Sequence, residues 1–433
     1  MTSRRSRSGT AADRGKILRF PVPALPQGKP GGWFAQLRRL GPGIVTGTAN
    51  VDPSLVVTAT VVGAAYSYSL LWVVLLCVPF LIATFAVSAR LGYETRKGLV
   101  DLLRVNYGRK VALACAVTIV LINMAMIIAD LMAVSDALSI ILMQRRAFFV
   151  AAVAFSVWYV LIFRDYKKIT GVLLWFSLPL LVYVAAAVLS VPDPKLLLLR
   201  TIIPRVNPTA AYAAAIVALF GSLLTPYVLV WQTSSRGEQA VSGGERPHTF
   251  ESHAGTFMTT MLSYSVMVAA ASVLHLPRAI DMTTRQAAEA LRPAAGDLGA
   301  ILFSVGIIGA GMVALPVLVA SLCYSVSEAM GWKAGLSEHP WDAGAFYVLI
   351  SLSMLIAAVA NFFSINPVKA LYFSQVLAGV LTVPILVFIL VLSNDRRVMK
   401  TTNSRWQNFW LGAAVGGVIA AAGLWLWFSV LKP

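Results

Sequence analysis

The chain has 433 residues, of which 58% are hydrophobic and only 12% are charged. Charged residues make up about a quarter of a typical soluble domain, so this composition excludes an ordinary soluble protein. The formal net charge is +17 at pH 7. Such a charge is compatible either with nucleic-acid binding or with a membrane protein whose basic loops set its orientation.

Eleven apolar stretches follow one another along the chain, separated by short polar connectors. A bilayer core of about 30 Å needs roughly 20 apolar residues per helix. The first stretch begins beyond residue 40, which is too late for a cleavable signal peptide. We therefore predict an all-α polytopic membrane protein with about 11 transmembrane helices. The stretches begin near Ile44, Leu70, Val111, Phe148, Gly171, Ala210, Gly255, Leu298, Ala343, Val368 and Asn408.

Basic residues are concentrated on alternate connectors. With the N-terminus inside, 25 of the 35 Lys and Arg residues lie in the N-terminal tail and the inside connectors, as the positive-inside rule requires. This explains the charge without a nucleic-acid partner, although the tail could also contact anionic lipid. We expect an integral protein of the plasma membrane with a cytoplasmic N-terminus and an outside C-terminus. Residues 1–40 are predicted to be a flexible basic tail, and residues 41–433 a transmembrane transporter domain.

Two of the stretches carry a proline flanked by small or hydroxyl residues at mid-membrane depth. The first, Gly43 to Ala65, contains Pro53, and the sixth, Ala210 to Gln232, contains Pro226. Proline lacks the N–H that closes the preceding helical turn, and the carbonyls it frees need protein, water or ligand partners in a membrane. Both helices are predicted to be discontinuous at these prolines. The alternative is that each proline only kinks its helix.

Paired breaks at corresponding places in two halves are typical of transporters with inverted repeats and a binding site at the bilayer midplane. The break in the sixth stretch comes five stretches after the break in the first. The expected organisation is a 5+5 inverted repeat of the leucine-transporter type. Its halves cover residues 41–192 and 208–394, and an eleventh helix follows at about 408–430.

Asp52 directly precedes Pro53, at a depth where a carboxylate costs on the order of 3 kcal/mol. A carboxylate beside carbonyl and hydroxyl oxygens suits a hard cation such as Mg²⁺, Mn²⁺ or Ca²⁺. The structural alternative is that Asp52 caps the second half of the first helix, and the two roles are compatible. The nearby oxygens belong to Asp52, Thr225, Asn50 or Ser54, and the main-chain carbonyls of Ala49 and Ser222.

Other polar groups within the apolar stretches are few. Asp130 fits either an ion or proton relay or a hydrogen-bonded structural acid. Gln375 could place an amide oxygen in the cavity, with helix–helix hydrogen bonding as the alternative. The histidines avoid both breaks, the three cysteines lack metal-site spacing, and no phosphate-binding or hydrolase motif is present. The sequence predicts no cofactor and no enzymatic activity.

Three segments carry extended motifs: GPGIVTGTANVDPS, GAAYSYSLLWVVLL and SQVLAGVLTVPILVFILVLSNDRRVM. They resemble the first, second and tenth helices of the Nramp family of divalent-metal transporters, and the resemblance covers roughly residues 38–430. It implies the leucine-transporter fold, with metal bound between the unwound parts of helices one and six.

The site motifs match this family only in part. Asp52 and Pro53 match the start of its Asp-Pro-Gly-Asn motif, whereas Ser54 and Leu55 stand where the family has its glycine and its metal-binding asparagine. The resemblance therefore implies the loss of one side-chain oxygen ligand at Leu55.

The sixth and third stretches also depart from the family pattern. Thr225, Pro226 and Tyr227 stand where the family has Met-Pro-His, so a hydroxyl replaces the thioether that favours transition metals. Asp130 matches a family acid, but Ala133 replaces the glutamate three residues later, and the ninth stretch has no arginine. These departures resemble the Nramp-related branch that transports Mg²⁺ and Mn²⁺ without evident proton coupling.

By this resemblance, the ion site is expected to contain one side-chain carboxylate, one hydroxyl and two carbonyls, surrounded by further lining residues. The expected ligands are Asp52, Thr225, Ala49 and Ser222, and the possible lining residues are Asn50, Ser54, Leu55, Tyr227, Gln375 and Asp130.

The sequence thus predicts alternating-access transport of a hard divalent cation, with Mg²⁺ or Mn²⁺ favoured and without proton coupling. Three rivals remain open. They are a proton-coupled Mn²⁺/Fe²⁺ symporter of the Nramp type, a transporter of an organic solute on the same fold, and a non-transporting membrane scaffold or sensor. The predicted partners are the divalent ion and the lipid bilayer, and the oligomeric state is not predicted.

Overall fold

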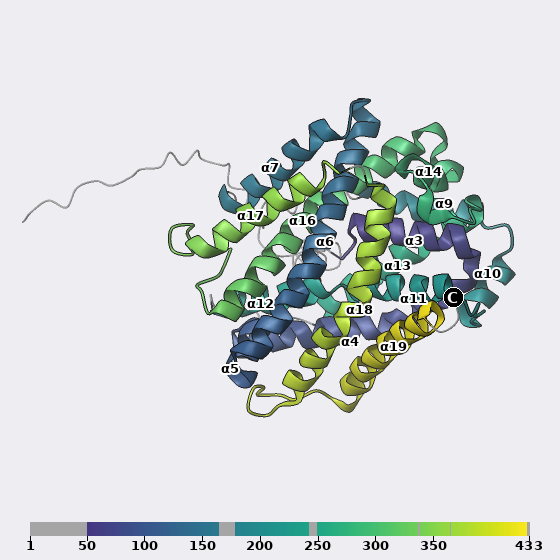
Figure 1. Ribbon diagram of the computed structural model, residues 1–433. Helices are drawn as coiled ribbons and strands as arrows, with labels where there is room; N and C mark the ends of the chain where they lie inside the picture. The colour runs from purple at the N-terminus through teal and green to yellow at the C-terminus, as the bar shows by residue number, and fades with distance from the viewer. Residues whose placement is uncertain (1–49, 164–177, 242–248, 337, 364, 431–433) are drawn as a thin grey trace, which may run out of the picture. The chain divides into compact units, whose positions relative to one another are not determined.

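The computed structural model describes residues 50–163, 178–241 and 249–430, except 337 and 364. The chain divides into two units, Met1–Arg39 and Leu40–Pro433, and every described residue belongs to the second. Within these residues all regular structure is helical (Figure 1). The expected tail, the first half of the first stretch and part of the fifth lie outside the described residues.

Twelve helices form the body of the described part of the chain. They are α3 (Pro53–Tyr66), α4 (Leu71–Thr95), α6 (Arg109–Leu142), α7 (Ala147–Phe163), α9 (Val182–Ser190), α11 (Ala210–Leu223), α12 (Pro226–Val241), α13 (Thr249–Val273), α16 (Gly299–Met330), α17 (Gly344–Ala360), α18 (Pro367–Asn394) and α19 (Arg405–Val430). Shorter connecting helices include α5 (Leu99–Tyr107), α10 (Pro194–Ile202), α14 (Thr284–Ala288) and α15 (Arg292–Ala295), with 3₁₀ turns η1 (Ser67–Leu70), η2 (Leu178–Leu181), η3 (Ala279–Asp281), η4 (Glu289–Leu291) and η5 (Gly296–Leu298).

The length and hydropathy of many described helices are those of membrane-spanning helices. Seven helical runs are long and apolar enough to cross a bilayer, or eight if the pair Pro179–Ser190 and Pro194–Ile202, bent by 115°, counts as one span. The run Pro53–Thr95 has 43 residues, about twice what one crossing needs, and η1 interrupts it. The all-helical, polytopic architecture is confirmed, whereas the total of eleven spans stays a prediction.

Capping residues in the sequence determine where several of these helices begin. The hydroxyl of Thr209 accepts the N–H of Tyr212 at the start of α11 (3.2 Å). The side-chain oxygen of Asn366 accepts the N–H of Val368 at the start of α18 (2.9 Å), and Pro367 occupies the first helical position. The capping side chains accept hydrogen bonds from main-chain N–H groups that would otherwise lack partners at the helix ends.

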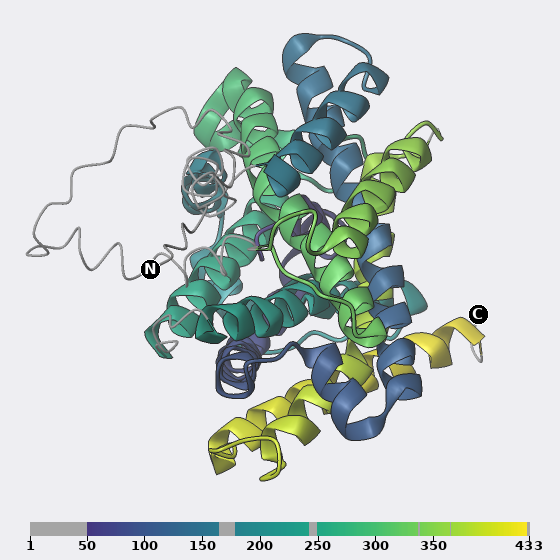
Figure 2. The same ribbon diagram turned by 90° about the vertical axis from the view of Figure 1, so that its left-hand side faces the viewer.

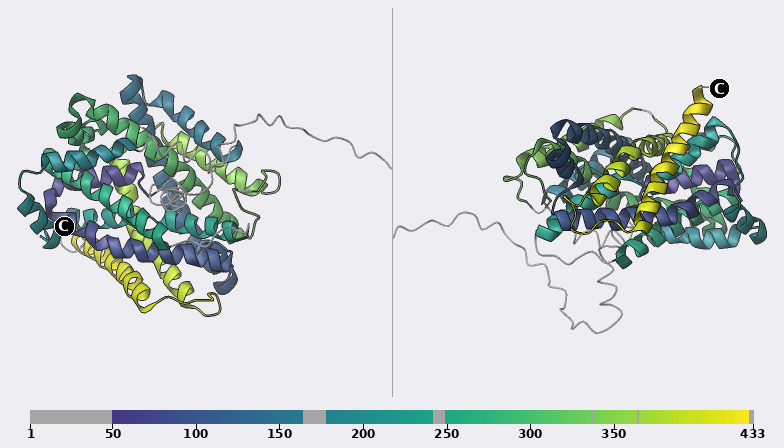
Figure 3. Two further views of the ribbon diagram at one scale, coloured as in Figure 1. Left: turned by 180° about the vertical axis from the view of Figure 1, so that it is seen from behind. Right: turned by 90° about the horizontal axis from the view of Figure 1, so that it is seen from below.

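The helices pack as pairs that are distant in sequence. α6 packs along α16, α3 along α13, α12 along α4, and α11 along α18. Figure 2 and Figure 3 show α19, in yellow, along the outside of the described bundle, where it contacts α11, α18 and α4. α3 and α11, which carry the two predicted breaks, both contact α18 and each other. Helices one and six are thus brought together within one core.

Two glycines permit the close approach of α11 and α18. A Cβ on Gly221 would lie 2.0 Å from the carbonyl oxygen of Gln375, and one on Gly379 would lie 2.3 Å from that of Val217. Backbone at such distances cannot accommodate a side chain without moving. Small residues at facing positions are how helices come close inside a membrane. This contact holds the segment before the sixth-helix break against α18.

We expect Gly221→Ala to destabilise the protein by about 1–3 kcal/mol, because the added methyl group forces the two backbones apart. Thermal unfolding of the purified protein in detergent measures the effect as a lower Tm. The matched control is Gly416→Ala on α19, where a Cβ meets no atom within 4 Å. There the change is expected to be neutral or stabilising, since alanine favours helix. Equal melting of the two variants would contradict the close approach.

Candidate metal centre at the two helix breaks

Asp52 lies at the N-terminal end of α3 and caps it. Its backbone is extended (φ −87°, ψ 168°), and its Oδ1 accepts the N–H of Leu55 at 2.6 Å. Pro53 occupies the first helical position, where its missing N–H is not needed. The capping role considered as an alternative is therefore present. It uses one carboxylate oxygen and leaves the second, Oδ2, for other partners.

The sixth stretch is broken where the sequence predicts. α11 ends at Leu223 and α12 begins at Pro226, so that Leu224 and Thr225 lie between the two helices. Pro226 has no N–H to bond to the carbonyl of Ser222 four residues earlier. The side chain of Ser222 turns back to the carbonyl of Leu219 (3.0 Å), so its main-chain carbonyl is the group that it can offer a ligand.

The two breaks meet through buried hydrogen bonds. The hydroxyl of Tyr227 donates to Oδ2 of Asp52 at 3.1 Å. Thr225 donates to the side-chain oxygen of Asn50, and the amide nitrogen of Asn50 donates to the carbonyl of Leu223 at 3.1 Å. All of these side chains are buried. Hydrogen bonds thus join the start of α3 to the break between α11 and α12, and the metal site expected there stays a prediction.

A second carboxylate lies next to this junction. The hydroxyl of Ser54 donates to Oδ1 of Asp130 on α6 at 2.6 Å, while Oδ2 of Asp130 has no hydrogen-bond partner within the described residues. Ser54, expected as a possible ion ligand, is thus directed to Asp130 instead. In the described part of the chain, neither Asp52 nor Asp130 forms an ion pair with Lys or Arg. Among the residues that the structure describes, no cationic side chain therefore pairs with either of these two acids.

Gln375 on α18 is fully buried, and neither atom of its side-chain amide has a partner within the described residues. An unsatisfied buried polar group costs about 1–3 kcal/mol, so such a group in a folded protein calls for a ligand or water. Its place on the helix that contacts both α3 and α11 agrees with the expected lining role. Ala49 lies outside the described residues.

Sequence reasoning did not single out Thr259 on α13, whose hydroxyl oxygen lies 3.5 Å from the amide nitrogen of Asn50. No local signal marks this threonine, because it is one of several hydroxyl residues on an apolar helix. Leu55 is fully buried and offers the junction only aliphatic carbon beyond its main chain. Its replacement of a polar residue is the clearest departure of the site from the expected ligand set.

The described residues hold no cluster of three or more His, Cys, Asp or Glu side chains that could bind a metal. The three cysteines are separately buried. The donors at the junction are oxygens from one carboxylate, one amide, two hydroxyls and main-chain carbonyls. Such a set, hard and of low charge, can hold a hard cation that keeps part of its water shell.

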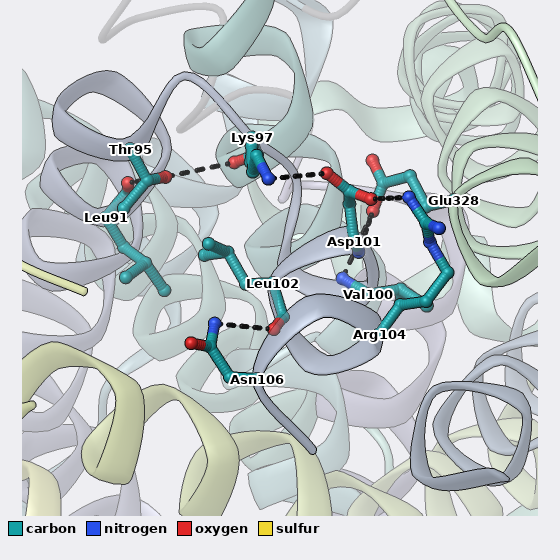
Figure 4. A network of polar contacts seen from close by, with 9 residues as sticks. All are labelled: Leu91, Thr95, Lys97, Val100, Asp101, Leu102, Arg104, Asn106 and Glu328. Carbon is teal, nitrogen blue, oxygen red and sulfur yellow. Dashed lines mark hydrogen bonds and ion pairs between the residues drawn. The ribbon is translucent and has the colours of Figure 1, made fainter. Parts of the chain in front are cut away.

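A separate cavity of about 420 Å³ lies between the ends of α12 and α16 and the start of α5. Glu328 on α16 forms its central contacts, accepting the N–H groups of Val100 (3.1 Å) and Asp101 (3.2 Å) and the hydroxyl of Ser234 on α12 (2.6 Å). Figure 4 shows Glu328 beside Val100 and Asp101, together with the bond from Arg104 to Asp101 (2.5 Å). A carboxylate at a helix N-terminus is favoured there, so Glu328 is a structural acid that joins three elements.

Comparison with known proteins identifies the family. The sequence profile of Nramp, described as natural resistance-associated macrophage protein-like, matches residues 43–429. The chain belongs to the Nramp family. The Nramp chain is therefore a membrane transporter protein and not an enzyme.

Characterised relatives of this Nramp protein are distant but span nearly its whole length. The divalent metal cation transporter MntH of Granulibacter bethesdensis is 22% identical over 403 residues, covering 90% of this chain and 88% of the relative. MntH of Klebsiella pneumoniae is 24% identical over 407 residues, covering 90% and 94%.

Solved structures show the same fold. The Eremococcus coleocola manganese transporter, in complex with an aromatic bis-isothiourea substituted compound, superposes with a TM-score of 0.71 at 16% identity and covers 94% of this chain and 91% of that one. MhsT in complex with L-phenylalanine gives a TM-score of 0.56 at 14% identity, covering 90% and 98%. The fold predicted from the sequence, that of Nramp and leucine-transporter-type proteins, is confirmed.

Replacing Glu328 by alanine in this Nramp protein is expected to lower stability by about 1–3 kcal/mol, because three buried or partly buried donors lose their acceptor. The loss is measured as a lower melting temperature in detergent. Glu289→Ala is the control, since Glu289 is half-exposed and pairs only with the exposed Arg292 at 3.6 Å, a contact worth about 0–1 kcal/mol. If both variants melt like the wild type, the structural role of Glu328 is refuted.

Proposed function

We propose that this protein transports a hard divalent cation, Mg²⁺ or Mn²⁺, across the membrane by alternating access. One observation carries the proposal: the carboxylate of Asp52 lies buried where the start of α3 meets the break between α11 and α12, among oxygen atoms and with no cationic side chain from the described residues. A buried charge needs compensation, and a divalent ion supplies it. The names of the relatives, which are divalent metal cation and manganese transporters, support the same substrate class.

The donor chemistry supports Mg²⁺ or Mn²⁺ over softer metals. Thr225 contributes a hydroxyl at the sixth-helix break, and no thiolate, imidazole or thioether ligand accompanies Asp52 in the contacts of the junction. Hard oxygen donors suit Mg²⁺, Mn²⁺ and Ca²⁺, whereas sulfur and imidazole donors favour Fe²⁺, Cu⁺ and Zn²⁺. The proposed ligands are Asp52, Thr225 and the carbonyls of Ala49 and Ser222, with Gln375 joining in one state of the transport cycle.

An organic solute fits the junction less well. Half-helix N-termini in transporters of this fold can hold the anionic group of a substrate. Here the N-terminus of α3 already binds the carboxylate of Asp52 through the N–H of Leu55. A substrate carboxylate would meet that negative charge at close range. Titration with amino acids and with metal ions separates the two substrate classes.

We propose transport without proton coupling. The sixth-helix break has Tyr227, whose hydroxyl donates to Asp52, where the family pattern has a histidine that titrates near neutral pH. Ala133 on α6 carries no acid, and α17 contains no arginine. Asp130 therefore lacks the glutamate and the arginine that the family pattern places along these helices.

The basic loops support a proposed orientation in the membrane, and the paired breaks support a proposed inverted repeat. The protein is placed in the plasma membrane with its N-terminus in the cytoplasm and its C-terminus outside, moving the ion inward. The helices are proposed to form a 5+5 inverted repeat in which one half moves against the other around the fixed junction. Residues 1–40 are proposed to be a cytoplasmic tail.

Replacing Asp52 by alanine is expected to reduce Mg²⁺ and Mn²⁺ uptake into proteoliposomes to background, because the site loses its charged ligand. Asp52→Asn keeps a helix-capping side chain and is expected to lose uptake as well, which separates charge from capping. The control Asp297→Ala removes an exposed carboxylate and is expected to transport normally. Wild-type uptake by a well-folded Asp52→Asn protein would rule out the site.

Uptake of the metal ion is expected to leave the pH of the vesicle lumen unchanged, because the groups needed for a proton route are missing. A pH-sensitive dye enclosed in proteoliposomes measures this while Mn²⁺ uptake is followed in parallel. Acidification that is stoichiometric with the metal and absent from empty liposomes would establish proton coupling and overturn the proposal.

A further inference from the structure

Leu55 leaves the proposed site one side-chain oxygen short, and the neighbouring residues do not replace it. The side chain of Leu55 is aliphatic and fully buried, and its N–H is used by Asp52. Ser54 has a hydroxyl, but that hydroxyl donates to Asp130 at 2.6 Å. The turn that follows Asp52 therefore supplies no further oxygen to the junction of the two breaks.

We propose that Asn50 supplies this oxygen and is a ligand of the transported cation. The inference rests on the proposed transport of a divalent cation and names a residue of that same site. Asn50 precedes Asp52 by two residues, on the opposite side of the capping residue from Leu55. Its side chain is fully buried and faces the sixth helix rather than its own.

Hydrogen bonds fix the orientation of the Asn50 amide. A carbonyl oxygen only accepts hydrogen bonds, so the atom of Asn50 that lies 3.1 Å from the Leu223 carbonyl is the nitrogen. The same nitrogen lies 3.5 Å from the hydroxyl oxygen of Thr259 on α13. Both contacts hold the nitrogen away from the break in the sixth helix. The amide oxygen is thereby directed to Thr225.

The oxygens of Asn50 and Thr225 are neighbours that come from opposite breaks. In this structure the Thr225 hydroxyl donates its hydrogen to the Asn50 oxygen. A hydroxyl rotates freely about its C–O bond and carries lone pairs as well as a hydrogen. When the hydrogen turns aside, both oxygens present lone pairs to one cation. Together with Asp52, they give the ion one side-chain ligand from the sixth helix and two from the first.

A purely structural role for Asn50 makes a different prediction. In that role only its nitrogen matters, because the nitrogen satisfies the Leu223 carbonyl next to the break. Asn50→Asp and Asn50→Leu both remove this donor, but only the aspartate variant keeps an oxygen in place. The two variants therefore separate the ligand role from the structural one.

The experiment measures Mn²⁺ and Mg²⁺ binding to the full-length protein in nanodiscs by isothermal titration, with uptake into proteoliposomes as a second readout. Asn50→Leu is expected to weaken binding at least about tenfold, while Asn50→Asp retains it. Adding Leu55→Asn to the Asn50→Leu protein is expected to restore binding by returning an amide oxygen from the other side of Asp52. The control is Asp297→Ala, which removes an exposed carboxylate and is expected to bind like the wild type.

Size-exclusion profiles and melting temperatures show whether each variant is folded, and the double variant keeps the test decisive if a single variant is unstable. Equal binding by wild type and folded Asn50→Leu overturns the inference but leaves the proposed function in place. Equal loss in Asn50→Asp and Asn50→Leu, without rescue by Leu55→Asn, also overturns it in favour of the structural role. A wild-type protein that binds neither ion overturns the proposed function itself.

Discussion

The buried carboxylate of Asp52, which has no cationic neighbour among the described residues, governs the arrangement of the junction. Asp52 receives one main-chain N–H and one hydroxyl, from Leu55 and Tyr227. Neutral donors of this kind stabilise a carboxylate through dipoles but leave its net charge intact. The surrounding apolar helices screen that charge weakly. The described core thus places a carboxyl group that is bonded only to neutral donors at the point where the start of α3 meets the break between α11 and α12.

The positions of the two breaks depend on contacts made elsewhere in the bundle. Gly221 and Gly379 let α11 and α18 approach until backbone meets backbone. On the other side, Gly311 of α16 has the side chains of Val134 and Pro53 against it, so a Cβ there would lie 2.2 Å from Val134. Small residues therefore allow close packing of α11 against α18 on one side of the junction and of α16 against Pro53 on the other. A close-packed interior of this kind transmits small shifts rather than absorbing them.

The sequence was sufficient to predict where the sixth stretch breaks and that a helix begins at Pro53 beside Asp52, because both effects are local. A missing N–H at Pro53 or Pro226 and a carboxylate in an apolar stretch have consequences that need no knowledge of distant residues. The fold class followed from the length and spacing of the apolar stretches. Here the physical argument, the family profile and the solved structures agree.

The partner of each oxygen could not be predicted in this way. Ser54 adjoins Asp52 in sequence, yet its hydroxyl points to Asp130 on another helix, and Asn50 pairs with residues more than 170 positions away. Such pairings depend on which rotamers remain after the helices have packed. Thr259 is the clearest example of a contact that the sequence could not predict. It lies near Asn50 only because α13 packs against this part of the chain.

The hydrogen bonds at the junction also bear on the binding of the proposed cargo. Both oxygens of Asp52 and the amide oxygen of Asn50 are already bonded to protein hydrogens. In the proposed site, an entering ion would take the place of the hydrogens that Tyr227 and Thr225 donate, and those hydrogen bonds would form again when the ion leaves. Loading is thus an exchange of one set of contacts for another, and its free energy is the difference between them. For the proposed cargo, these protein hydrogens are competitors for the same oxygen atoms.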